Sequence, residues 1–259
     1  MLPRQELLKG IENQQTITRV LDLAEQALKT WELRATDFLS PPELAEVERI
    51  FSRLTEVQML TWGGYPQAER QRCLIGRVEL SLTAEQVPVV AVEIAGNFLF
   101  DPATHRDFLG AMLNCGVDRS KTGDIIVLGE RGAQAVIGSE LLEFFSLELK
   151  QVRSVPVRVK PIDWLDLKIR PPQTKEMVTT EASLRLDAIA SAGFGLSRSK
   201  MVDLINAGEV RVNWQETSQP SYNIKTGDLI TVRGKGRLQI GEIAITKKER
   251  YRIQLTRII

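Results

Sequence analysis

The sequence is poor in the side chains on which most catalytic sites and metal centres depend. Its 259 residues include a single histidine, two cysteines and only 6% aromatic residues. The two cysteines, Cys73 and Cys115, lie far apart and belong to no Cys-x-x-Cys or Cys/His cluster, which argues against a disulfide framework and against a zinc site. We therefore expect no metal, no cofactor and a reducing, cytoplasmic environment.

Long apolar runs are also absent. No stretch approaches the roughly 18 uninterrupted apolar residues that a membrane span requires, and residues 1–15 lack the apolar segment of a secretory signal. The chain is nonetheless 43% hydrophobic, which is enough to bury a core, and its length predicts two or three domains. We expect a soluble protein without a transmembrane segment.

The charge is distributed unevenly along the chain, although the formal net charge is only +1. Residues 175–259 hold fourteen Lys or Arg against nine Asp or Glu, a net charge of +5. Residues 1–174 hold twenty against twenty-four, a net charge of −4. A basic C-terminal third is typical of a region that contacts nucleic-acid phosphates.

A short basic helix is predicted within this C-terminal third. Ser197 is a suitable N-cap, an apolar stripe follows it at helical spacing, and Gly208 marks the C-terminal end. The first-turn amides and the helix dipole place partial positive charge beside Arg198 and Lys200. Both side chains are therefore predicted to contact phosphate.

The residues that follow predict a strand with one buried and one polar face. Val210 and Val212 alternate with Arg211 and Asn213, so the valines would be buried and the polar pair presented outward. Trp214 comes next, where an Asn-Gly type I′ turn would need glycine. Its ring could stack on a base or plug the hairpin, and the sequence leaves both open.

A second basic run, residues 233–237, contains glycines that let the backbone approach RNA closely. Asp187 is expected to orient an arginine, either Arg185 or Arg198, and to have no chemistry of its own. We expect the cations to gather into one surface that complements a folded polyanion. The predicted RNA-binding residues are Arg185, Ser197, Arg198, Lys200, Arg211, Asn213, Arg233, Lys235 and Arg237.

The N-terminal 174 residues predict two further regions. Residues 1–62 have helical apolar periodicity, and a capping box with proline at the first helical position opens a third helix at Ser40. Residues 63–170 predict an α+β domain of order β-α-β-β-α-β, as in the ferredoxin-like plan, if a first strand at 72–82 is set aside. Its predicted elements are strands 87–95, 124–128, 133–137 and 155–159 and helices 105–113 and 140–149.

No aromatic residue lies on the predicted central strands of this α+β domain, so base stacking there is not expected. His105 could act as a general acid or base but has no nucleophile in its local sequence, and a helix start capped by Thr104 is the better interpretation. A second contact surface is also predicted, with structural salt bridges as the alternative. Its residues are Tyr65, Arg70, Arg72, His105, Arg106 and Arg119.

Several short motifs of residues 183–238 occur in a familiar order. They are Arg185-Leu186-Asp187, Ser197-Arg198-Ser199-Lys200, Val210-Arg211-Val212-Asn213, Gly227-Asp228 and the run 233–237. This stretch resembles the domain named after small-subunit ribosomal protein four, also called the alpha-L RNA-binding motif. The resemblance implies that residues 183–259 form such a domain, with residues 171–182 as a linker.

Two stretches of the middle region extend the resemblance over nearly the full length. Residues 63–72 and 104–113, with Gly116-Val117-Asp118-Arg119 and Gly123-Asp124-Ile125, resemble the bacterial YlmH family. That resemblance implies an α+β protein, namely a helical segment (1–62), a ferredoxin-like domain (63–170) and the RNA-binding domain. The chain also resembles a cyanobacterial and plastid branch that is labelled a photosystem II-associated protein.

The YlmH resemblance implies that the protein binds structured RNA, namely rRNA and tRNA, on a large ribosomal subunit obstructed by an unfinished chain. It implies no catalysis. Two alternatives remain open at this point. One is an RNA-modifying enzyme, because pseudouridine synthases carry the same module and an Arg-Leu-Asp triplet. The other is an assembly factor for photosystem II that acts through protein or membrane contacts.

Overall fold

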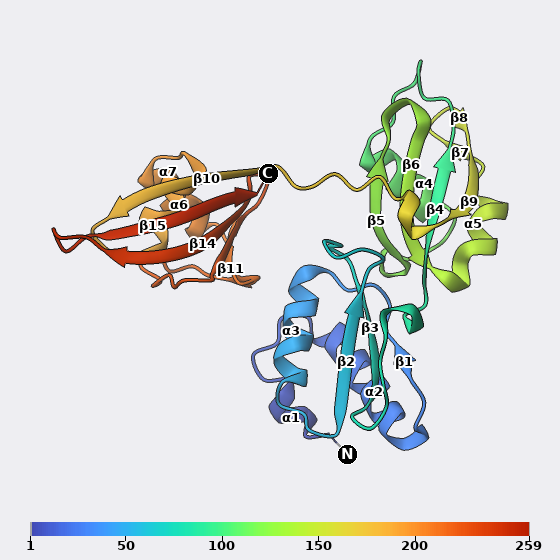
Figure 1. Ribbon diagram of the computed structural model, residues 1–259, viewed down its shortest axis with the longest axis horizontal. Coiled ribbons are helices and arrows are strands. Elements are labelled where there is room, and N and C mark those ends of the chain that lie inside the picture. The colour runs from blue at the N-terminus through green and yellow to red at the C-terminus, as the bar shows by residue number, and fades with distance from the viewer. Residues whose placement is uncertain (1, 259) are drawn as a thin grey trace. The chain divides into compact units, whose positions relative to one another are not determined.

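The computed structural model describes residues 2–258 and divides the chain into two compact units, residues 1–169 and 170–259. Buried hydrophobic side chains form three separate cores, two in the first unit and one in the second. The expected α+β fold class is confirmed (Figure 1). Over residues 2–258, no helix is both long enough and apolar enough to cross a membrane.

The N-terminal region packs helices against a small sheet of strand order β1-β3-β2. Its elements are α1 (Arg4–Leu7), α2 (Gln14–Thr30), β1 (Arg34–Ala35), α3 (Pro41–Phe51), β2 (Val57–Trp62) and β3 (Arg72–Arg77). The predicted capping box is confirmed, since Glu43 accepts hydrogen bonds from the backbone and hydroxyl of Ser40.

A purely helical segment at 1–62 is not what the structure shows. Strand β2 closes that segment, and its partner β3 lies beyond residue 62, with Val57 opposite Arg77. Buried side chains of β3, Cys73 and Ile75, belong to the core that α2 and α3 cover. The pairing joins distant residues, so the local helical pattern could not reveal it.

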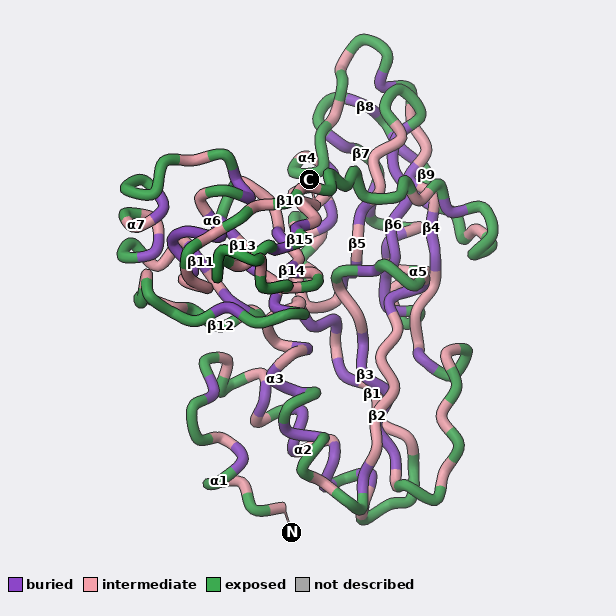
Figure 2. Tube along the Cα trace, turned by 60° about the vertical axis from the view of Figure 1, so that its left-hand side comes forward, coloured by how far each residue is buried: buried purple, intermediate pink, exposed green. Residues whose placement is uncertain are grey.

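The middle region has the predicted β-α-β-β-α-β order. Its main elements are β4 (Val89–Ala95), α4 (His105–Asn114), β5 (Thr122–Val127), β6 (Gly132–Gly138), α5 (Leu142–Glu148) and β9 (Arg158–Ile162). The strands form an antiparallel sheet of order β5-β6-β4-β9, in which β6 separates β5 from β4 as the split plan requires. Figure 2 shows β6 buried along its length.

The last strand of this sheet lies later than residues 155–159. Before it comes a short hairpin of β7 (Gln151–Val152) and β8 (Val155–Pro156), and only then does β9 pair with β4. The turn between β7 and β8 contains Arg153 at a φ of 53°. The alternation of buried and exposed residues is continuous from 155 to 160, so the sequence pattern merges two strands into one.

The C-terminal unit is a six-stranded antiparallel sheet with two helices. Its elements are β10 (Thr174–Glu181), α6 (Leu186–Phe194), α7 (Arg198–Asn206), β11 (Val210–Val212), β12 (Gln215–Glu216), β13 (Leu229–Val232), β14 (Gly236–Ile245) and β15 (Tyr251–Ile258). The strand order is β10-β15-β14-β13-β11-β12. The linker predicted at 171–182 is corrected, because most of it is β10, which pairs with β15 from Thr174 opposite Ile258 to Glu181 opposite Tyr251.

Helix α6 approaches the sheet closely at Gly193. A Cβ atom added there would lie 2.2 Å from Cδ2 of Leu238, a fully buried residue of β14. The missing side chain therefore sets how closely α6, which begins beside Arg185, packs on the sheet. By contrast, a Cβ atom at Gly110 in α4 would meet nothing within 4 Å.

These two helical glycines give opposite predictions. We expect Gly193→Ala to destabilise the C-terminal unit by about 1–3 kcal/mol, because a packed core resists an added methyl group. Gly110→Ala should stabilise its helix by about 0.5–1 kcal/mol, because alanine loses less backbone entropy on folding. Native-state amide hydrogen exchange, which reports stability element by element, would test both, and equal effects at the two sites would contradict the packing argument.

Candidate nucleic-acid interface

A buried carboxylate organises the start of the two helices in the C-terminal unit. Asp187, whose side chain is 3% exposed, accepts hydrogen bonds from Nε and Nη2 of Arg185 at 3.1 and 2.8 Å. Its Oδ1 also accepts one from Nη2 of Arg198 at 3.1 Å. The prediction that Asp187 orients Arg185 or Arg198 is confirmed, and it orients both.

The protonation of Asp187 follows from this geometry. Burial alone would raise the pKa of the carboxyl group, but the hydrogen bonds from Arg185 and Arg198 outweigh burial and hold the pKa below its usual value. The carboxylate is therefore ionised at neutral pH. Both guanidinium groups remain accessible, with side chains 40% and 55% exposed.

The N-terminus of α7 adds two further predicted residues. The Ser197 hydroxyl accepts a hydrogen bond from the backbone N–H of Lys200 at 3.2 Å, so the predicted N-cap is confirmed. The Lys200 side chain is exposed beside it. We call Arg185, Ser197, Arg198 and Lys200 the helix-end cluster. Its three cations outnumber the single carboxylate, Asp187, that two of them contact.

The turn between β11 and β12 has the backbone of a type I′ hairpin without glycine. Asn213 and Trp214 both have positive φ, 49° and 68°, as the two central residues of that turn require. The Asn213 amide donates to Asp228 Oδ1 and accepts from Leu229 N–H, both at 2.9 Å. Nη1 of Arg211 donates to the Trp214 carbonyl at 3.0 Å. These side-chain contacts hold a bulky residue in a conformation that it rarely adopts.

The remaining cations lie away from the helix-end cluster, which corrects the expectation of one surface. Because Val210 and Val212 point into the core beneath the helices, Arg211 points from the opposite face of the sheet. Arg237 lies on that same face, since Thr231 pairs with both residues across three strands. Its guanidinium lies 5.8 Å from the centre of the Trp214 ring.

Arg233 and Lys235 belong to the turn between β13 and β14. The Arg233 side chain is 83% exposed and lies 3.6 Å from a carboxylate oxygen of Glu209. The Arg233 backbone N–H donates to the Glu209 carbonyl, which places this turn beside the start of β11 and beyond the C-terminal end of α7. The predicted RNA-binding residues therefore form three groups, of which the helix-end cluster is the most tightly organised.

The Asp187 contacts predict a pH-dependent stability. Since the folded pKa is lowered, the ionised carboxylate stabilises the unit above the usual Asp pKa of about 3.9, and this is lost as the pH falls through the folded pKa. We expect Asp187→Asn to lower the unfolding free energy by about 1–3 kcal/mol at neutral pH. Urea titrations from neutral to acid pH should show this difference shrinking.

The matched control is Asp203→Asn, which changes an exposed carboxylate on α7. It should alter the unfolding free energy by no more than about 0.5 kcal/mol at any pH. An Asp187→Asn deficit that stays constant down to acid pH would contradict the assigned ionisation.

Four of the residues predicted for a second contact surface brace the first unit internally. Asp124 of β5 accepts from the Tyr65 hydroxyl at 2.7 Å and from the backbone N–H of Arg70 at 3.1 Å. The Arg70 guanidinium donates to the carbonyls of Phe38 and Thr122, and Arg119 donates to the Thr122 carbonyl at 2.6 Å. The contacts of Asp124 and Arg70 join the N-terminal region to the middle region, whereas the Arg119 contact is local to the start of β5.

Burial is visible in the pKa values of this group. It raises the pKa of Tyr65, with a further contribution from the Asp124 charge. It lowers the pKa of Arg70, and it lowers that of Arg119 to about 10, with a further contribution from the nearby Arg70 charge. Both guanidinium groups remain charged at neutral pH.

Arg72 is the clearest correction to the predicted second surface. Its side chain is only 7% exposed, and it donates to the carbonyls of Thr36 and Pro88 and to both oxygens of Glu140. A residue buried in this way has no face to present to RNA. The salt-bridge alternative, left open by the sequence, is the one that the structure has.

Removing this guanidinium should destabilise the first unit. Arg72→Ala would leave two backbone carbonyls without their donors, and we expect a loss of about 2–4 kcal/mol of unfolding free energy. Arg106→Ala, at an exposed position, should change it by less than about 0.5 kcal/mol. Hydrogen exchange of the β3 amides would measure both, and equal protection in the two variants would refute the bracing role.

His105 and Arg106 differ from the other four because both are exposed. His105 begins α4 after a capping box in which Asp107 accepts from the backbone N–H and hydroxyl of Thr104, both at 2.7 Å. The expected helix start capped by Thr104 is confirmed, and Asp107 forms part of a surface network, 3.7 Å from Arg153.

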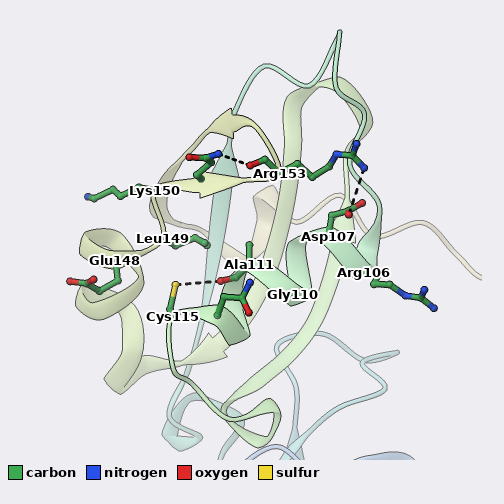
Figure 3. A pocket seen from close by; sticks show the side chains of 11 residues that line it. Arg106, Asp107, Gly110, Ala111, Cys115, Glu148, Leu149, Lys150 and Arg153 are labelled. Atoms are coloured by element: carbon green, nitrogen blue, oxygen red, sulfur yellow. Dashed lines mark hydrogen bonds and ion pairs between the residues drawn. The ribbon is translucent and has the colours of Figure 1, made fainter.

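A polar cavity of about 720 Å³ opens beside Arg106, between α4 and the segment that joins α5 to β7 (Figure 3). The sequence did not predict this cavity, since its walls come from segments some 40 residues apart. Cys115 faces it with its thiol hydrogen-bonded to the Ala111 carbonyl. Its other charged lining residues are Asp107, Glu148, Lys150 and Arg153.

Family comparisons account for each of the three regions. Residues 12–80 match the family described as "YlmH, N-terminal", residues 83–166 match "Putative RNA-binding domain in YlmH", and residues 184–230 match the S4 domain. The chain is 30% identical over 242 residues to ribosome-associated protein quality control protein P2 of Bacillus subtilis, covering 93% of each protein. The chain belongs to the YlmH family.

Other similarities are more restricted. Small ribosomal subunit protein uS4 of Verminephrobacter eiseniae is 43% identical over 61 residues, which cover 23% of this YlmH-family chain and 29% of that protein. A solved structure, cell division protein ylmH from Streptococcus pneumoniae, matches with a TM-score of 0.53 and 23% identity, over 62% of this chain and 96% of that one. This structural match concerns the fold alone.

Proposed function

We propose that this YlmH-family protein is a non-catalytic, cytoplasmic RNA-binding protein that recognises structured RNA, namely rRNA and tRNA, on a large ribosomal subunit obstructed by an unfinished chain. The observation that carries the proposal is the helix-end cluster, in which Asp187 orients two accessible arginines. The relative from Bacillus subtilis is named for ribosome-associated quality control, which supports the ribosomal setting.

The geometry of the helix-end cluster suits a phosphate ligand. Each guanidinium has five N–H donors in a planar fork, and Asp187 engages two of those of Arg185 and one of those of Arg198. The remaining donors can bind phosphate oxygens without loss of the orienting contact. Lys200 and the N-terminal amides of α7 add positive potential at the same place.

The same contacts disfavour a pseudouridine-synthase-like enzyme. A catalytic aspartate has to reach the substrate, whereas Asp187 is 3% exposed and both of its oxygens accept hydrogen bonds from arginine. The Arg185-Leu186-Asp187 triplet therefore supports a binding role. The photosystem II assembly role is the competing proposal, and binding to membranes instead of RNA in co-sedimentation would favour it.

Salt dependence gives a quantitative test of the helix-end cluster. Removing one phosphate contact should flatten the plot of log affinity against log salt by roughly 0.7–0.9. We therefore expect Arg198→Ala/Lys200→Ala to weaken binding of large-subunit rRNA fragments and to lose roughly twice that slope. Binding titrations over a range of salt concentrations would measure both quantities.

The matched control is Lys247→Ala/Lys248→Ala, which removes the same charge from exposed residues of the turn between β14 and β15. It should leave most of the affinity and of the salt slope. If the two double variants lose the same affinity and slope, the helix-end cluster is not the binding site and only the overall charge matters.

A further inference from the structure

The loop that joins β4 to α4 presents an aromatic ring to solvent. Phe100 is 91% exposed and its neighbour Leu99 is 49% exposed. Figure 1 shows this loop extending beyond the end of the sheet before the chain enters α4. Exposure of large apolar side chains side by side is unfavourable in water, so their position calls for an explanation.

The N-terminal half of the loop is anchored in the core. Phe98 is fully buried, with its ring 5.1 Å from that of Phe108. Its backbone N–H donates to the Glu130 carbonyl at 2.9 Å. The Asn97 side chain accepts a hydrogen bond from the Leu99 backbone N–H at 3.2 Å, which fixes the turn toward Phe100.

The C-terminal half of the loop is anchored by Asp101. Its carboxylate accepts from Nε of Arg153 at 2.7 Å and from the hydroxyl of Ser154 at 2.6 Å. Phe100 therefore lies between two fixed residues, Phe98, which is buried in the core, and Asp101, which is hydrogen-bonded to the β7–β8 turn. A loop tied at both ends presents its ring in a limited set of orientations, which lowers the entropy cost of binding.

Cations lie at the same end of the domain. Arg131 is exposed in the turn before β6, the turn whose Glu130 carbonyl holds the loop. Arg153 holds Asp101 and also lines the polar cavity together with Arg106 and Lys150. Within residues 2–258 Arg131 forms no ion pair, and its side chain is exposed, so its guanidinium can donate to a ligand.

We propose that Phe100 is a stacking platform for an unpaired RNA base, with Arg131 and Arg153 placed to take the adjoining phosphate. Aromatic rings flanked by basic groups are the usual means of binding unpaired nucleotides. Arg131 follows Glu130, whose carbonyl binds Phe98, and Arg153 binds Asp101, so both guanidinium groups belong to the segments that anchor the loop. The inference rests on the proposed RNA-binding function. It adds a contact between the middle region and an unpaired part of the RNA.

The test compares variants of the full chain on two RNA probes of equal nucleotide number, a hairpin with an unstructured loop and a blunt duplex. We expect Phe100→Ala to weaken hairpin binding by roughly 5- to 150-fold, the range for loss of one stacked base, and to leave duplex binding unchanged. Because no charge is lost, the salt slope should not change. Phe100→Trp should bind the hairpin at least as tightly as the original protein.

Two matched controls separate stacking from simple hydrophobicity. Phe100→Leu retains an apolar side chain without a flat ring, so it should behave like Phe100→Ala. Leu165→Ala removes an apolar side chain that is also 91% exposed, and it should have no effect. Since both positions are so exposed, folding of these variants should be unaffected.

The outcomes distinguish this inference from the proposed function. If the original protein binds neither probe nor rRNA fragments, the proposed function fails. If it binds both probes and Phe100→Ala binds the hairpin equally well, only the stacking inference fails. A third outcome is that Phe100→Ala keeps its affinity for the hairpin but no longer associates with large ribosomal subunits, while Phe100→Leu still does. That outcome would assign the loop to an apolar protein pocket and overturn the inference.

Discussion

A guanidinium group carries five N–H donors and keeps its charge at any physiological pH, so each arginine removed from water must be supplied with acceptors. Both units of this protein are organised by that requirement. In the first unit, backbone carbonyls accept hydrogen bonds from Arg70, Arg72 and Arg119. In the second unit, one buried carboxylate, Asp187, accepts hydrogen bonds from Arg185 and Arg198, and both arginine side chains remain accessible to solvent.

The difference between these two arrangements distinguishes arginines that stabilise the fold from arginines that we propose bind RNA. Arg70 and Arg72 donate to carbonyls of both the N-terminal and the middle region and so hold the two together, which leaves few of their donors for a ligand. Arginines held by a carboxylate beneath them keep donors on the outer side, where a phosphate can approach. The same residue type therefore serves stability in one unit and, in the function that we propose, recognition of RNA in the other, and the acceptors around it determine which.

The proposed division of RNA contacts follows from these arrangements. The helix-end cluster is suited to phosphates of folded RNA because it combines oriented cations with a helix N-terminus. The loop at Phe100 is suited to an unpaired base because it offers a ring without a charge of its own. Electrostatic and stacking contacts respond differently to salt, so the two contributions can be measured separately.

Local features were well predicted from the sequence. The capping box at Ser40, the N-cap at Ser197 and the strand with alternating valines at 210–212 all depend on residues within a few positions of one another. The orienting role of Asp187 was also predicted, because its partners lie two and eleven residues away. The β-α-β-β-α-β order of the middle region followed from the succession of such local patterns.

Features that depend on distant partners were not predicted. Strand β10 carries few apolar residues, and it is a strand because β15, some 80 residues later, pairs with it. Nothing in the sequence distinguishes Arg72 from Arg106, yet Arg72 is buried against Pro88 and Glu140 whereas Arg106 is exposed. In the same way the sequence does not distinguish Phe98 from Phe100, but the Phe98 ring packs against the Phe108 ring whereas Phe100 is exposed.

The sequence by itself determined the class of this protein, its basic C-terminal module and the caps of its helices, because these depend on composition and on contacts between near neighbours. The tertiary structure alone decided which arginines brace the fold, which remain available to a ligand, and that the cations of the C-terminal unit divide between two faces of a sheet. The physical reason is that burial and hydrogen-bond acceptors are supplied by residues remote in the chain. A side chain acquires its role from those surroundings.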